Sequence, residues 1–166
     1  TYTDMINIFG NYQSSSFEEI DFYALAATDR TSLILYSFHD NTVLAATFNT
    51  ELAEEQGIIA GSMMLLKGLN TYWGTNVNIH RSPFQGRSME YMSQDPILTG
   101  YIGAAYTYGG SSTGAVFYIK HCPLNEQETD RGRQNLFTFA SEQAMREIYF
   151  KPFQMAVQEG GAKGMM

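Results

Sequence analysis

NTYWGTNVNIH, residues 70–80, and TGAVFYIKH, residues 113–121, are two short runs of apolar and β-branched residues that predict strands. Between them, ILTGYIGAAYTYGG, residues 97–110, predicts a helix. Asp95 and Pro96 stand immediately before it as an N-cap and a first helical residue, and Gly109 with Gly110 mark its expected end. Strand, helix and strand in this order indicate two parallel strands joined by a crossover helix.

The same alternation extends over the rest of the chain from about residue 42. TVLAATFN, residues 42–49, predicts a further strand, and the helix expected after it has one apolar face, made of Leu52, Ile59, Met63 and Leu66. Ser141 is the expected N-cap of a helix over residues 142–159, which Pro152 should kink. AKGMM, residues 162–166, predicts the beginning of one more strand.

Repeated strand and helix units place the chain in the α/β class, as either a doubly wound sheet or a (β/α)₈ barrel. Neither a Gly-x-Gly-x-x-Gly nor a Gly-x-x-x-x-Gly-Lys-Ser/Thr motif occurs, which weakens the nucleotide-binding alternatives. Polar side chains instead gather after the expected strands, where barrels collect their functional groups. We therefore expect a partial (β/α)₈, TIM-barrel-like domain with parallel strands and flanking helices, because a whole barrel takes about 250 residues.

Composition excludes several classes of function. The formal net charge of −7 gives no favourable field for phosphate backbones or anionic lipid, so neither nucleic acid nor a membrane is an expected partner. A single cysteine and three histidines without metal-ligand spacing predict no disulfide, no metal and no cofactor. The sequence shows no signal-peptide pattern, and this favours a cytoplasmic location.

Two polar clusters follow the two central strands. The first contains His80, Arg81, Arg87 and Glu90, and the second contains Lys120, His121 and Glu126. Such residues can be an ordinary solvated loop or the wall of a site for a polar ligand. Because the carboxyl ends of parallel strands meet at one edge, the two clusters should face each other. Arginine supplies a planar fork of donors, which suits vicinal hydroxyls or a carboxylate.

NIHRSPFQGRSMEYMSQDPILTG, residues 78–100, resembles the Asn-Ile-His-Arg-x-Pro signature of glycoside hydrolase family 3, the β-glucosidase family. KHCPLNEQETDR, residues 120–131, is similar to the Lys-His-Phe-x-x-Asn-x-Gln-Glu-x-x-Arg segment of that family. The resemblance covers about residues 42–166, which we assign to a partial family 3 N-terminal barrel domain. Residues 1–41 match poorly and are either the first barrel strands or a linker.

The resemblance implies roles for particular residues. Arg87, Lys120 and His121 match family positions that bind hydroxyls of a terminal glucose ring, and Met166 matches a methionine that lines the sugar site. Asp29 is the best match to a further sugar ligand. Arg81 and Glu90 are expected to support the site, with Glu90 either holding Arg81 or Arg87 in place or contacting the sugar itself.

The family's retaining chemistry needs two carboxyl groups about 5 Å apart. The resemblance places the nucleophilic Asp and the acid/base Glu outside this chain, so we expect no catalytic residue within it. The expected function is the sugar-binding half of an enzyme that cleaves terminal β-D-glucosides, and the chain alone should be inactive. The expected ligands are β-linked glucosides or oligosaccharides, with the remainder of the enzyme or a second domain as a partner. The alternative is a non-catalytic sugar-binding or scaffold module of the same family.

Overall fold

Three parallel strands form a sheet in the order in which they occur in the sequence. The structure is a computed structural model, and it describes residues 38–66, 68–133 and 136–166. Strand β1 (Thr71–Asn76) pairs with β2 (Val116–Lys120), and β2 pairs with the short β3 (Gly164–Met165). The strands predicted in residues 70–80, 113–121 and 162–166 are confirmed.

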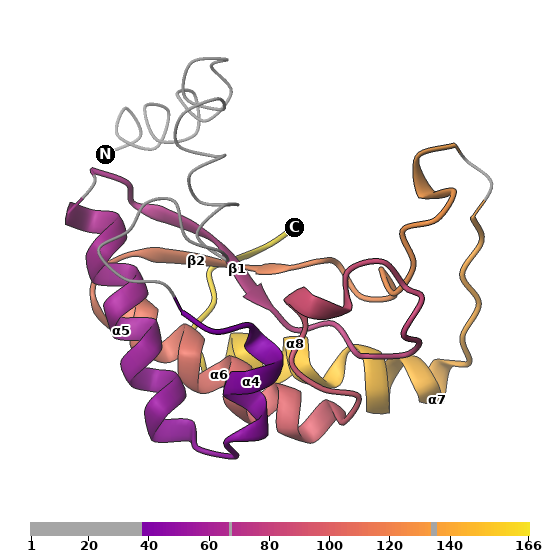
Figure 1. Cartoon of the computed structure of the whole chain (residues 1–166), viewed down its shortest axis with the longest axis horizontal. Helices are drawn as coiled ribbons and strands as arrows, with labels where there is room; N and C mark the ends of the chain where they lie inside the picture. The colour runs from indigo at the N-terminus through magenta and orange to yellow at the C-terminus, as the bar shows by residue number, and fades with distance from the viewer. Residues whose placement is uncertain (1–37, 67, 134–135) are drawn as a thin grey trace. The chain divides into compact units, whose positions relative to one another are not determined.

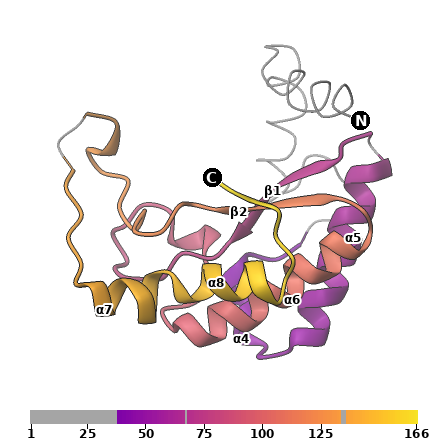
Figure 2. The ribbon, with the colours of Figure 1, turned by 180° about the vertical axis from the view of Figure 1, so that it is seen from behind.

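The long helices cover one face of this sheet. α5 (Thr50–Leu66), α6 (Pro96–Ser112) and α8 (Lys151–Gln158) lie on the same side of β1 and β2, as both views show (Figures 1 and 2). Sequential strand order with the crossover helices on a single face is the arrangement of a barrel wall, whereas a doubly wound sheet carries helices on both faces. The structure therefore supports the barrel-like alternative.

Helix α6 begins as the sequence predicts. The Asp95 carboxylate accepts the backbone N–H groups of Ile97 at 2.7 Å and Leu98 at 3.0 Å, which satisfies two of the donors that a helix leaves free at its start. The predicted stop at Gly109 and Gly110 is wrong, because the helix continues to Ser112. Both glycines lie inside it and are buried.

These glycines let α6 approach α5 closely. A Cβ at Gly109 would lie 2.1 Å from the Glu54 carbonyl oxygen, and a Cβ at Gly57 would lie 2.1 Å from that of Tyr106. The predicted inward face of α5 is consequently wrong. Leu52, Ile59 and Leu66 are exposed and Met63 is half-buried, while the buried residues are Ala53, Gly57, Ala60, Gly61 and Met64. The backbones of the two helices lie so close together that only small residues fit between them.

Residues 42–49 do not form the predicted strand. They lie mostly in helix α4 (Asn41–Ala46), which buries Leu44 and Ala45. A short apolar run has no period that separates a strand from a buried helical turn. The helix is held by tertiary contacts, since the Asn41 side-chain amide donates to the Glu90 carbonyl at 2.8 Å and the Thr42 hydroxyl to that of Tyr91 at 2.9 Å.

The last helical region is broken, as Pro152 predicts. Ser141 accepts the N–H of Ala144 at 3.1 Å and opens α7 (Glu142–Ala144), a π-helical turn η4 (Met145–Tyr149) follows, and α8 begins at Lys151. Phe153 and Ala156 of α8 pack into the core beneath the sheet with Val77 and Ile119. None of the helices in the described ranges is long and apolar enough to cross a membrane.

Candidate functional site: a polar cluster at the strand ends

Asn78 joins the ends of the two central strands. Its side chain is fully buried, its Oδ1 accepts the backbone N–H of His121, and its Nδ2 donates to Glu126 Oε1 at 3.1 Å. The loop after β1 is thereby tied to the loop after β2, because one amide satisfies a backbone group and a carboxylate at once. The polar clusters that follow the two strands do face each other, as the sequence predicts.

His121 is held as a neutral imidazole. Burial, followed by the charges of Arg87, Lys120 and Arg131, lowers the pKa of His121 to about 3. Its Nδ1 lies 3.3 Å from the hydroxyl of Tyr91, and that hydroxyl donates to the Asn125 carbonyl at 3.3 Å.

The Tyr91 hydrogen bond determines the tautomer of His121. Since the Tyr91 hydrogen points to Asn125, the His121 hydrogen lies on Nδ1 and Nε2 carries a lone pair. Nε2 is buried and has no partner among the described residues. Nε2 is therefore an unused hydrogen-bond acceptor.

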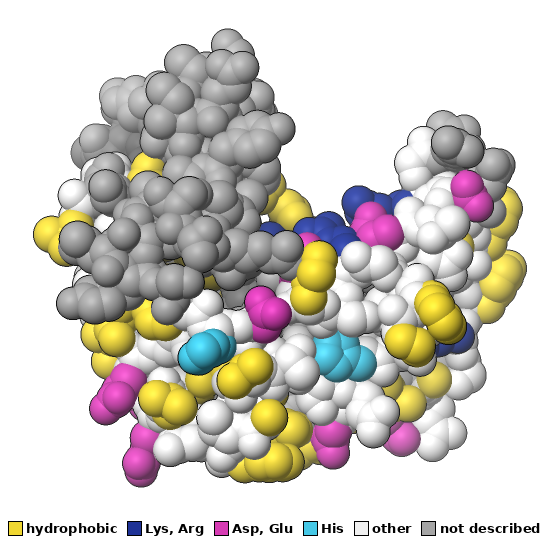
Figure 3. Space-filling view, in the orientation of Figure 1, with side chains coloured by type: hydrophobic (Ala, Val, Ile, Leu, Met, Phe, Trp, Pro, Cys, Tyr) yellow, Lys and Arg dark blue, Asp and Glu magenta, His cyan; other side chains and the backbone are white. Residues whose placement is uncertain are grey.

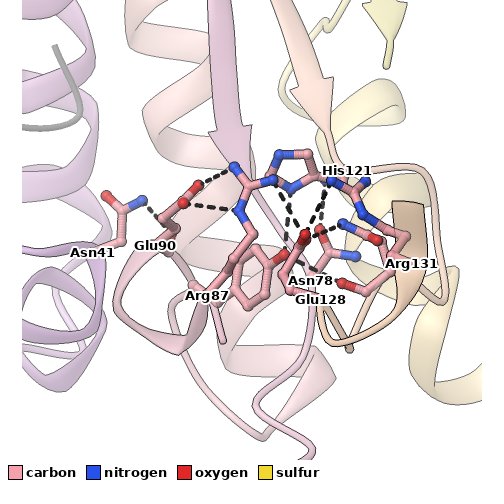
Figure 4. Close-up of polar contacts among 9 residues, drawn as sticks. Asn41, Asn78, Arg87, Glu90, His121, Glu128 and Arg131 are labelled. Carbon is pink, nitrogen blue, oxygen red and sulfur yellow. Dashed lines mark hydrogen bonds and ion pairs between the residues drawn. The ribbon is translucent and has the colours of Figure 1, made fainter. Parts of the chain in front are cut away.

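Arg87 is fixed by carboxylates on two sides. Its Nε and Nη2 donate to Glu90 at 2.9 and 2.8 Å, and its Nη1 lies 3.5 Å from Glu128, whose other oxygen is 3.0 Å from Arg131 Nη2. Burial alone would lower the pKa of Arg87, but the hydrogen bond and charge of Glu90 outweigh it and raise the pKa. Figure 4 shows Arg87 and Arg131 converging on Glu128 beside His121, which gives a rigid array of donors.

The other predicted site residues are placed as follows. Lys120 is buried at the end of β2, and the 3₁₀ turn η2 (Ser88–Glu90) carries Glu90, which pairs with Arg87. Arg81 lies outside this cluster, with its guanidinium carbon 5.9 Å from the centre of the Tyr149 ring. Asp29 lies outside the described residues.

A hollow of about 390 Å³ opens beside His121, and we call it the His121 hollow. Its lining residues are His121, Cys122, Pro123, Leu124, Asn125, Arg131, Leu136, Thr138 and Met166. The 3₁₀ turn η3 (Arg131–Arg133) carries Arg131. The volume is in the range of small-molecule sites. Among the described residues, no Asp or Glu lines it, so the hollow offers hydrogen bonds without a carboxylate.

Sequence reasoning missed four members of this cluster: Asn78, Tyr91, Glu128 and Arg131. Asn78 and Tyr91 are fully buried polar side chains, and their partners come from a segment at least 30 positions away. Local pattern therefore could not reveal their partners. Arg131 stands inside the quoted 120–131 segment, and that position was the available signal.

Comparison with known proteins identifies the family. Residues 31–166 match the description "Glycosyl hydrolase family 3 N terminal domain". A β-glucosidase of Ruminococcus albus is 41% identical over 131 residues, which are 79% of this chain and 14% of that protein. A β-glucosidase of Rhizobium radiobacter is 40% identical over 123 residues, 74% of this chain and 15% of that protein. The chain belongs to glycosyl hydrolase family 3.

Solved structures of family 3 enzymes share the fold. β-Glucosidase 3B from Thermotoga neapolitana in complex with glucose has a TM-score of 0.75 and 38% identity, covering 78% of this chain and 18% of that one. The Kluyveromyces marxianus β-glucosidase in complex with glucose has a TM-score of 0.74 and 32% identity, covering 78% of this chain and 15% of that one. The family 3 chain described here thus spans 14 to 18% of the length of these four relatives.

Proposed function

We propose that this chain supplies the glucose-binding wall of a retaining family 3 β-glucosidase. The observation that carries the proposal is the His121 hollow, which is lined by His121, Asn125 and Arg131 and whose His121 has a ring nitrogen without a partner among the described residues. A glucose ring presents hydroxyls that both donate and accept, and these groups match them. The relatives' names and the glucose in two of the solved structures support the same ligand.

Arg87, Lys120, His121 and Met166 are the proposed sugar contacts, with Asp29 as a further ligand. Of these residues, His121 and Met166 line the His121 hollow. Glu90 and Glu128 act as positioning residues, because each holds the Arg87 guanidinium. Fixing the ring in one orientation before reaction lowers the entropic part of the barrier. The role of this wall is therefore orientation of the terminal sugar.

The proposed reaction takes its two carboxylates from outside this chain. One attacks the anomeric carbon, the other protonates the leaving oxygen, and water then releases the sugar with retention. The carboxylates of the described cluster make other interactions. Glu90 and Glu128 form ion pairs with arginines, and Glu126 accepts a hydrogen bond from Asn78. We expect the isolated chain to bind glucose weakly and to leave an aryl β-glucoside intact.

A titration and a chimera test this function. Glucose added to the chain in a calorimeter should bind, and His121→Ala should weaken binding about tenfold, equivalent to about 1.4 kcal/mol. His39→Ala is the matched control, because His39 is exposed. Replacing the corresponding segment of the Thermotoga neapolitana enzyme with residues 39–166 should preserve hydrolysis, and His121→Ala should then reduce kcat/KM about a hundredfold.

The chimera also separates the proposal from a non-catalytic module. A module derived from the family would bind glucose in isolation but give an inactive chimera. If the isolated chain hydrolysed an aryl β-glucoside and His121→Ala abolished this activity, the two catalytic carboxylates could not both lie outside this chain, and the proposal would be refuted.

A further inference from the structure

Tyr91 connects two residues of the His121 hollow without lining it. Among the described residues it is the largest of the fully buried side chains, and its exposed fraction is 0%. Its hydroxyl lies 3.3 Å from His121 Nδ1 and 3.3 Å from the Asn125 carbonyl oxygen, and both of these residues line the hollow. Tyr91 can therefore act on the hollow only through His121 and Asn125.

The two contacts of the Tyr91 hydroxyl have opposite directions. A carbonyl oxygen only accepts, so the hydroxyl donates to Asn125 and its oxygen accepts from Nδ1–H of His121. Because no surface of Tyr91 is exposed, bulk water does not reach this oxygen. Its removal would leave a buried donor and a buried acceptor unsatisfied.

The backbone that carries Tyr91 is itself held at several points. The Tyr91 N–H donates to the Ser88 carbonyl at 3.1 Å, and the Tyr91 carbonyl accepts from the Thr42 hydroxyl at 2.9 Å. Asn41 donates to the carbonyl of the preceding residue, Glu90, as Figure 4 shows. The start of α4 and the turn η2 thus fix the position from which the Tyr91 hydroxyl reaches His121.

The charges around His121 leave its tautomer as the open variable. Figure 3 shows Lys and Arg side chains gathered beside acidic ones on the described part of the molecule. Arg87, Lys120 and Arg131 act together with burial to lower the pKa of His121, so the imidazole is neutral near pH 7. A neutral imidazole has two tautomers. Since Nε2 has no partner among the described residues, the Tyr91 contact decides between them.

We propose that Tyr91 is a positioning residue for His121, whose hydroxyl keeps the imidazole proton on Nδ1 and holds the ring beside the Asn125 backbone. This hold on His121 needs no ligand. Its consequence for sugar binding rests on the proposed function, in which His121 contacts glucose. An imidazole with its proton on Nε2 would present a donor in place of an acceptor.

The first test needs no variant. Nitrogen-15 NMR of the 166-residue chain at about pH 8, where imidazoles are neutral, shows which ring nitrogen carries the proton. We expect Nδ1 for His121. His80 is an internal reference with the opposite tautomer, because its Nε2 lies 2.6 Å from the Ser88 carbonyl oxygen and must donate to it. The signals that disappear in His121→Ala identify those of His121.

Tyr91→Phe tests the role of the hydroxyl. The variant keeps the ring that fills the buried site, so it should fold, and circular dichroism will check this. We expect the His121 proton to move toward Nε2, and glucose binding measured by calorimetry to weaken about three- to tenfold. Tyr108→Phe is the matched control and should change neither, because Tyr108 is 54% exposed.

The outcomes separate this proposal from the proposed function. A proton on Nε2 of His121 in the original chain would overturn the role of Tyr91, and so would an unchanged tautomer in Tyr91→Phe. A changed tautomer with unchanged glucose affinity would also overturn it. If the original chain bound no glucose but Tyr91→Phe changed the tautomer, the proposed function would be wrong and the hold of Tyr91 on His121 would be supported.

Discussion

At the scale of single residues, His121 makes stability depend on pH. Its pKa is about 3 in the folded chain and about 6.5 in an unfolded one, so between these values the unfolded chain binds more protons. This contribution to the free energy of unfolding is fully present above pH 6.5 and is lost as the pH falls. Between pH 6.5 and 5 the loss should be about 2 kcal/mol. Glu126 opposes it, because its raised pKa has the reverse sign.

His121→Asn should flatten this profile. We expect a free energy of unfolding about 1–3 kcal/mol lower at pH 7, from lost packing and the lost Tyr91 contact, and a smaller decrease between pH 6.5 and 5. Urea denaturation at several pH values measures both. His39→Asn, at an exposed position, should keep the slope of the original chain, and an unchanged slope in His121→Asn would contradict the prediction.

The residues of the cluster were only partly predictable from sequence. Arg87, Glu90 and His121 stand in motifs that can be recognised locally, and the structure brings them together. The role of Tyr91 was not predictable, because it depends on contact between its hydroxyl and the imidazole of His121, 30 positions away. A side chain that acts through a distant partner leaves no local signal.

At the scale of elements, the contact between α5 and α6 depends on glycine. Gly109→Ala would place a Cβ 2.1 Å from a carbonyl oxygen of α5, and a backbone atom cannot rotate away. Alanine favours a helix by about 1 kcal/mol, but the forced separation of the helices should outweigh this and lower the free energy of unfolding by about 1–3 kcal/mol. Thermal and urea denaturation will measure the change.

Gly132→Ala is the matched control for Gly109→Ala. A Cβ there would meet no atom within 4 Å, so stability should stay within about 0.5 kcal/mol. Equal stability of the Gly109→Ala and original chains would mean that the two helices can separate without cost.

The elements show where sequence patterns succeed and where they fail. Asp95 and Ser141 were predicted correctly as caps, because a cap is a contact between residues two or three positions apart. Residues 42–49 were mispredicted because bonds from Asn41 and Thr42 to the loop at Glu90 and Tyr91 favour a helix there. The face of α5 was mispredicted because backbone proximity mattered more than side-chain hydrophobicity.

At the scale of the whole molecule, α5 carries a row of exposed apolar side chains. Leu52, Ile59 and Leu66 are exposed on this helix, and the exposed fraction of Leu66 is 78%. Phe48, just before the helix, has an exposed fraction of 75%. Apolar side chains gathered on one surface mark a place where another protein surface packs. The same helix is charged near its start, where Glu51, Glu54 and Glu55 stand, so its apolar residues have a polar border.

We expect the isolated chain to self-associate through this surface. Sedimentation velocity should show a weight-average mass that rises with protein concentration, and Leu66→Lys should reduce the rise, because a lysine ammonium resists desolvation at an apolar contact. Thr50→Lys is the matched control, since it adds the same charge at an exposed polar position of α5 without removing apolar area. If Leu66→Lys and Thr50→Lys reduced association equally, the added positive charge, and not the apolar surface of α5, would govern assembly.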